Sequence, residues 1–73
     1  MGKRGGQLNN NICDLRASAG GMTQQELADR IGVTRQTINA IEANKYSPSL
    51  EVAFEITLVF KLPLDRIFQY RKA

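Results

Sequence analysis

Apolar side chains recur at helical spacing along most of this chain, in short segments separated by glycine, proline and turn residues. The first segment spans residues 8–18, where Leu8, Ile12 and Leu15 stand at i, i+4 and i+7. The asparagines at 9–11 are poor helix formers and favour a late helix start. The last spans residues 64–70, directly after Pro63. The β-branched residues sit inside these helical periodicities, so the pattern predicts helices and no strand.

The three inner segments carry clear start and stop signals. Residues 23–26 (Thr-Gln-Gln-Glu) form a capping box that predicts a helix start, and Gly32 predicts its end. Thr34 is the expected cap of a helix over residues 35–43, which Asn44 ends in a left-handed conformation. A fourth helix is expected over roughly residues 50–60, capped by Ser49.

This fourth helix is apolar around most of its circumference, which predicts a central position or a position shared with a second subunit. One face, expected to point inward, carries Leu50, Ala53, Ile56 and Phe60. Phe54 and Leu58 lie on another face and remain available for a partner.

Composition limits the domain count and the class of protein. The 73 residues are enough for one domain, expected over residues 8–70, with a flexible arm at 1–7 and a basic tail at 71–73. The net charge of +3 favours a polyanionic partner only mildly. One cysteine, Cys13, permits no internal disulfide and is expected to be semi-buried. Without a signal-like segment or a long apolar run, the chain is expected to be cytoplasmic, with no membrane contact.

Enzymatic chemistry is not supported by the residues present. The chain has no histidine, no glycine-rich phosphate loop and no pair of carboxylates set in a plausible pocket. We therefore expect no catalytic residue, no metal, no cofactor and no small-molecule ligand.

The short join between the second and third helices carries the functional signal. Only residues 32–34 separate the two helices, so they must cross steeply and leave one face of the third helix clear of the domain. That face carries Arg35, Gln36, Asn39, Ala40 and Ala43, opposite two isoleucines. In the major groove of DNA, arginine can make two hydrogen bonds to guanine and glutamine can make two to adenine, while alanine permits close approach.

Each of these residues also has an ordinary structural interpretation. An exposed Arg-Gln pair is usually a solvated helix face, and alanines are good helix formers; their joint placement after a glycine turn is what favours DNA. Gln24 lies at the first turn of the second helix, where amides attract a phosphate. Lys45 and Tyr46 follow the third helix and are expected to clamp the DNA backbone, although the Tyr46 ring can equally pack on the fourth helix.

Taken together, the motifs of this chain resemble those of a known family. The segments MTQQELA (22–28), IGVTRQTI (31–38) and SPSL (47–50), with Ile12, Leu15, Arg16, Glu42 and the Asn44-Lys45 pair, are similar to the lambda-repressor/Cro-like helix-turn-helix family, also called the Xre family. The resemblance covers roughly residues 8–70 and is closest to small single-domain members. It implies an all-α, five-helix fold whose second and third helices form the helix-turn-helix, and a homodimer that regulates transcription on a palindromic operator in double-stranded DNA.

The resemblance matches Gln24 to a phosphate contact and Arg35, Gln36 and Ala40, with Thr34 at the edge, to base-contacting positions. The other contacts are expected from residue chemistry and position. Base contacts are expected from Thr34, Arg35, Gln36, Asn39 and Ala40. Phosphate contacts are expected from Thr23, Gln24, Thr37, Lys45 and Tyr46. Arg16 and Glu42 match an ion pair between the first and third helices, which would turn the acid of Glu42 inward.

The chain departs from the family pattern at three places. One extra residue separates Arg16 from Met22, so that the turn at residues 20–21 is longer and the match of Arg16 can shift. Ala43 replaces a residue whose side chain would contact a phosphate, and Lys61 replaces a common glycine, at a cost of about 1 kcal/mol if it is left-handed.

A dimer surface is expected on the last two helices, at Leu64, Ile67, Phe68, Phe54 and Leu58. For Ile67, a place in the chain's own core is about as good an interpretation. The pattern leaves open a repressor, an activator, a restriction-modification controller, an antitoxin and, outside DNA binding, a protein-interaction module.

Overall fold

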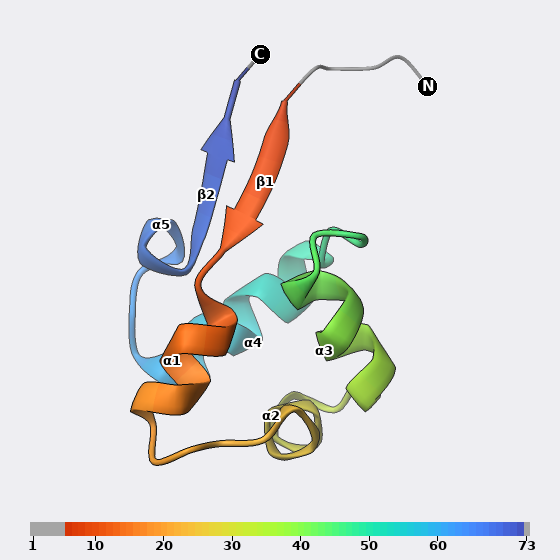
Figure 1. The fold of residues 1–73 in the computed structure, drawn as a ribbon, viewed down its shortest axis with the longest axis vertical. Coiled ribbons are helices and arrows are strands. Elements are labelled where there is room, and N and C mark those ends of the chain that lie inside the picture. The colour runs from red at the N-terminus through yellow and green to blue at the C-terminus, as the bar shows by residue number, and fades with distance from the viewer. Residues whose placement is uncertain (1–5, 73) are drawn as a thin grey trace.

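The computed structural model describes residues 6–72, which form five helices and one two-stranded antiparallel sheet. The helices gather into one body and the paired strands project from it (Figure 1). The elements are β1 (Gln7–Asn10), α1 (Ile12–Ser18), α2 (Gln24–Ile31), α3 (Arg35–Glu42), α4 (Leu50–Phe60), α5 (Leu64–Ile67) and β2 (Phe68–Arg71).

Every helix contributes at least one fully buried side chain to a single core. Burial of each large aliphatic side chain contributes roughly 1.5–3 kcal/mol, so this core supplies most of the force that holds such short helices. These side chains are Ile12, Leu27, Ile38, Ile41, Ile56 and Ile67.

The capping box of α2 is formed as predicted. The Thr23 hydroxyl accepts from the Glu26 main-chain N–H at 3.0 Å, and the Glu26 carboxylate accepts from the Thr23 N–H at 2.8 Å. Gly32 ends α2 in the left-handed region with φ 79°. Both ends of this helix are therefore set by local sequence.

The predicted caps of α3 and α4 are confirmed as well. Thr34 accepts from the Thr37 N–H at 3.1 Å, and Ser49 accepts from the Val52 N–H at 3.2 Å. Asn44 and Lys61 both take the left-handed conformation, with φ values of 60° and 57°. For Lys61 this conformation costs about 1 kcal/mol relative to glycine.

Near both ends of the described residues the structure has a strand where the sequence pattern predicted only helix. Residues 7–10 form β1 instead of the first turns of a helix, and α5 is one turn that ends at Ile67, before β2. In the sheet Leu8 lies opposite Tyr70, and Asn10 lies opposite Phe68. Asparagine is a poor helix former, and the partner strand is about sixty residues away in sequence, so helical periodicity alone misassigned both segments.

The paired strands also shift the domain bounds. Gln7 and Arg71 pair with each other, so the folded part extends beyond the predicted 8–70 at both ends. Residues 1–5 of the predicted arm and residue 73 of the predicted tail lie outside the described residues.

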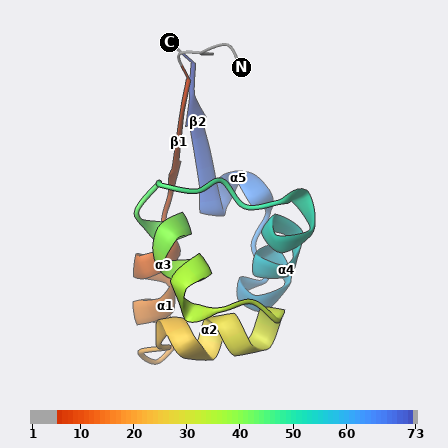
Figure 2. The same ribbon diagram turned by 90° about the vertical axis from the view of Figure 1, so that its right-hand side faces the viewer.

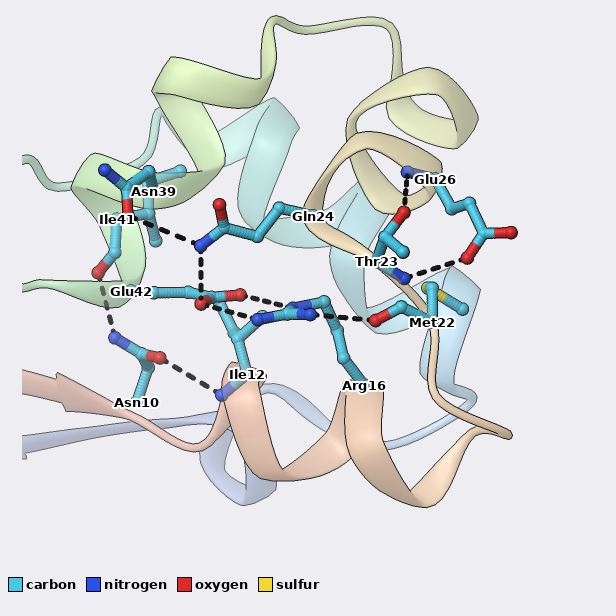
Figure 3. A network of polar contacts seen from close by, with 10 residues as sticks. All are labelled: Asn10, Ile12, Arg16, Met22, Thr23, Gln24, Glu26, Asn39, Ile41 and Glu42. Atoms are coloured by element: carbon cyan, nitrogen blue, oxygen red, sulfur yellow. Dashed lines mark hydrogen bonds and ion pairs between the residues drawn. The ribbon is translucent and has the colours of Figure 1, made fainter.

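The base of the sheet is bound to the end of α3. The Asn10 side-chain amide donates to the Ile41 carbonyl at 2.9 Å (Figure 3). It also donates to the Asn44 side-chain oxygen at 3.0 Å. Asn44 in turn donates to the Asn9 side chain at 3.4 Å. Because an isolated two-stranded sheet is marginal in water, these contacts help to fix its position.

Two expected burial positions were wrong. Leu50, predicted to face inward, is 69% exposed, whereas Ala53 and Ile56 of the same helix are buried. Cys13, predicted to be semi-buried, is exposed. Over residues 6–72 no helix combines the length and apolar character needed to cross a membrane.

Candidate nucleic-acid interface

Four of the five residues predicted to contact bases, Arg35, Gln36, Asn39 and Ala40, belong to α3, and Thr34 caps its start. Figure 2 views the molecule from the side on which α3 lies. Arg35, Gln36 and Asn39 are exposed and Ala40 is half-buried. Ile38 and Ile41 of the same helix are buried in the core, which fixes the rotation of α3. We call Arg35, Gln36, Asn39 and Ala40 the α3 polar face.

The acid at the end of α3 is turned away from this face. Arg16 Nε donates to Glu42 Oε2 at 2.6 Å, and Arg16 Nη2 donates to Glu42 Oε1 at 2.9 Å. Arg16 Nη1 also donates to the Met22 carbonyl at 2.8 Å, so the longer turn after α1 still brings Arg16 to Glu42. Hydrogen bonding to Glu42 raises the pKa of Arg16 above its ordinary value, against the opposing effect of partial burial.

Gln24 joins this pair from the first turn of α2. Its amide nitrogen donates to Glu42 Oε1 at 3.0 Å and lies 3.4 Å from Asn39 Oδ1 (Figure 3). The side chain predicted to contact a phosphate is therefore engaged inside the chain. Nothing in the sequence pattern indicated this contact, because it joins residues from two different helices.

The threonines predicted to contact DNA have local roles at helix starts. Thr23 and Thr34 hydroxyls accept the N–H groups that cap α2 and α3. The Thr37 hydroxyl lies 2.9 Å from that of Thr34, and Thr37 is half-buried.

The segment after α3 passes beside the sheet. Lys45 is exposed, and Tyr46 keeps 53% of its surface exposed. Tyr46 lines a surface depression together with residues of β1, including Gln7 and Leu8. The tyrosine ring thus lies near the paired strands, a neighbour that the sequence pattern did not predict.

A second shallow depression lies at the start of α2. It is lined by Cys13, Arg16, Ala17, Gly21, Met22, Thr23, Gln24, Gln25 and Arg35. The depression places Arg35 of α3 beside the first turn of α2, where main-chain N–H groups have no partner within a helix. A cation and free amides together suit an anionic group.

The residues predicted to form a dimer divide into two groups. Ile67 is fully buried and Phe68 is 8% exposed, both within the chain's own core, so neither offers a partner much surface. Phe68 is therefore not available as the main dimer contact that the sequence predicted, because its side chain packs into the chain's own core. Phe54 and Leu58 are 52% and 70% exposed and Leu64 is 39% exposed.

Leu50 extends this exposed group, since Leu50, Phe54 and Leu58 recur every fourth residue along α4. We call these three residues the α4 apolar stripe. Sequence periodicity identified two of its members and assigned Leu50 to the core.

The sequence prediction also missed the tie between Asn10 and the end of α3. The only sequence signal was the run of three asparagines at residues 9–11, an unusual start for a helix.

Comparison with known proteins identifies the family. A family model described as "Helix-turn-helix" matches residues 14–67. A Methanocaldococcus jannaschii protein is 51% identical over 49 residues, which cover 67% of this chain and 74% of that protein. Proteins from Archaeoglobus fulgidus and Bacillus subtilis are 43% and 39% identical over 61 residues, covering 84% of this chain and 86% and 91% of theirs.

All three relatives are named uncharacterized HTH-type transcriptional regulators. The chain belongs to the helix-turn-helix family, as its sequence motifs predicted.

Proposed function

We propose that this protein is a transcriptional regulator that binds a specific double-stranded DNA operator, with α3 in the major groove. The α3 polar face carries the proposal: it presents Arg35, Gln36 and Asn39 to solvent, and Ala40 leaves room for close approach. These side chains offer the donors and acceptors that distinguish bases in the major groove. The names of the three relatives support a regulator over an enzyme.

The charge distribution supports the same partner. Glu42 is the acid nearest to the α3 polar face in sequence, and two hydrogen bonds from Arg16 neutralise it. Arg35 and Lys45 are exposed at the two ends of the helix. A polyanion approaching α3 therefore meets cations at both ends.

The start of α2 is the proposed site for a phosphate of the DNA backbone. The Gln24 side chain is held by Glu42, so we assign the contact to the main-chain N–H groups of Gln24 and Gln25. Arg35 lines the same depression and adds a positive charge. Lys45 and Tyr46 are proposed to hold the DNA backbone at the other end of α3.

A second copy of the chain is the proposed partner of the α4 apolar stripe. One recognition helix covers only a few base pairs, too few to specify a single site in a genome, whereas two copies related by a two-fold axis bind a palindrome. The stripe and Leu64 supply exposed apolar side chains that a symmetric helix pair would bury. The same stripe is the observation that would favour a protein-interaction module instead.

Selection of bound sequences from a random duplex pool tests this function. We expect enrichment of a palindrome whose half-sites lie about one helical turn, roughly 34 Å, apart. Binding of the selected site should weaken steeply as salt rises, because phosphate contacts release counterions. The matched control is the double variant Arg35→Ala, Gln36→Ala, which should keep its helical circular dichroism spectrum and lose the enrichment.

Failure of the wild-type chain to enrich any sequence, together with salt-insensitive retention of duplexes, would reject DNA recognition. An enriched site without two-fold symmetry would reject the homodimer on a palindrome.

A further inference from the structure

A chain of hydrogen bonds behind the α3 polar face begins at an ion pair and links Arg16, Glu42, Gln24 and Asn39. The guanidinium of Arg16 donates to both carboxylate oxygens of Glu42, at 2.6 and 2.9 Å. An ionised carboxylate accepts hydrogen bonds and donates none. Whatever group contacts Glu42 from another side must therefore be a donor.

That group is the side-chain amide of Gln24, at 3.0 Å from Glu42 Oε1. An amide has a nitrogen that donates and an oxygen that accepts, and only the nitrogen can face Glu42. The acid thus fixes which way the Gln24 amide points. The second hydrogen on the same nitrogen is left for another acceptor.

Asn39 supplies that acceptor from the middle of α3. Its Oδ1 lies 3.4 Å from Gln24 Nε2, so its amide oxygen faces inward (Figure 3). The Asn39 nitrogen then has both hydrogens directed away from Gln24. Because Asn39 is exposed, these hydrogens are available to a ligand of the α3 polar face.

We propose that Glu42 and Gln24 orient Asn39 so that it offers DNA only hydrogen-bond donors, which makes it a contact for guanine. This inference rests on the proposed function. A freely rotating asparagine pairs with adenine, giving one hydrogen bond to N7 and taking one from N6. With its oxygen held by Gln24, Asn39 cannot accept from adenine N6, whereas O6 and N7 of guanine both accept.

Gln24 is accordingly a positioning residue and Asn39 a specificity-determining residue. The experiment compares sequences selected by the wild-type chain and by the variants Asn39→Ala, Gln24→Ala and Asn39→Asp. The matched control is Gln69→Ala: Gln69 of β2 is exposed and its side-chain amide donates to the Asp65 carbonyl at 3.4 Å, outside this network. Circular dichroism melts establish that each variant is folded.

Base preference is compared at the position where Asn39→Ala becomes indifferent. There the wild-type chain and Gln69→Ala should favour guanine over adenine by about 5-fold to 150-fold. Gln24→Ala frees the Asn39 amide to turn over, so guanine and adenine should become equal to within about twofold. Asn39→Asp can only accept, so its preference should move to cytosine, whose N4 donates. Asn39→Asp also keeps the test open if Gln24→Ala does not fold.

Three outcomes would overturn the proposal. A preference of the wild-type chain for adenine at this position would show that the Asn39 oxygen faces the base. If Gln24→Ala lowers the affinity for all duplexes equally and leaves the base preference unchanged, Gln24 is a phosphate contact. Asn39→Ala with no change at any base position would make Asn39 a phosphate contact or no contact. Failure of the wild-type chain to select any sequence would instead reject the proposed function itself.

Discussion

Removing one partner of the Arg16–Glu42 pair should destabilise the fold far more than removing both. The two side chains keep only 13% and 10% of their surface exposed, and they share two hydrogen bonds. Replacing Glu42 with leucine leaves a guanidinium with one remaining partner, the Met22 carbonyl, and deprives Gln24 of an acceptor. Replacing Arg16 with methionine leaves a partly buried carboxylate without a counter-ion, whose remaining donor is the Gln24 amide.

The size of the effect follows from this partial burial. Breaking a fully buried pair from one side costs about 3–5 kcal/mol. Because water still reaches both groups, we expect about 2–3 kcal/mol for Arg16→Met and for Glu42→Leu. The midpoint of thermal unfolding should then fall by about 8–24 °C in a domain of this size. The double variant carries two apolar side chains of similar volume and should lie within about 1 kcal/mol of the wild type.

Urea unfolding of the four proteins at pH 7 gives a double-mutant cycle that measures this coupling. Gln25→Ala, which removes an exposed contact to Asp29, is the control and should change stability by less than about 0.5 kcal/mol. The raised pKa of Arg16 means that, while Glu42 is ionised, its contribution is present at pH 7 and up to the ordinary arginine value, and is lost only as pH rises beyond that value. Strictly additive single effects, or a coupling that disappears between about pH 7 and 10, would refute the pair as a stabilising unit.

Arg35→Ala and Gln36→Ala should each weaken the binding free energy for the selected operator by about 1–3 kcal/mol and leave binding to random duplex almost unchanged. Fluorescence anisotropy measures both affinities, and equal losses on the two duplexes would make these residues phosphate contacts. Phe54→Asp should sediment as a monomer with an unchanged helical spectrum, whereas Phe68→Asp should unfold because its ring is buried; a wild-type chain that is monomeric at micromolar concentration would contradict this. Asn10→Ala should lower the free energy of unfolding by about 1–3 kcal/mol, because the Ile41 carbonyl loses a donor, and unchanged urea midpoints would exclude that role.

The three inner helices were predictable because their ends are set by neighbouring residues. Thr23, Thr34 and Ser49 each accept a main-chain N–H three residues ahead, and such a contact is complete within one turn. The α3 polar face followed for the same reason: once Thr34 fixes the start of the helix and two isoleucines fix its buried side, the positions of Arg35 and Gln36 are determined.

The terminal segments could not be assigned from local pattern. Residues 7–10 become a strand only because residues 68–71 lie beside them, and Asn10 gains its partners from the end of α3. Spacing of apolar residues favoured a helix for both segments, since Leu8 and Phe68 fit a helical period as well as an extended one. Pairing across about sixty residues outweighed that local preference.

The helix-turn-helix, its caps and the polar face of α3 follow from local sequence, because each depends on contacts between residues a few positions apart. Which apolar residues are covered depends on the packing of distant segments: Phe68 is buried and Leu50 is exposed, although both fit an amphipathic pattern. The same packing also sets the direction of the Gln24 and Asn39 amides. A side chain's orientation is set by its neighbours in space, and here Gln24 meets Glu42 and Asn39 across the gap between two helices.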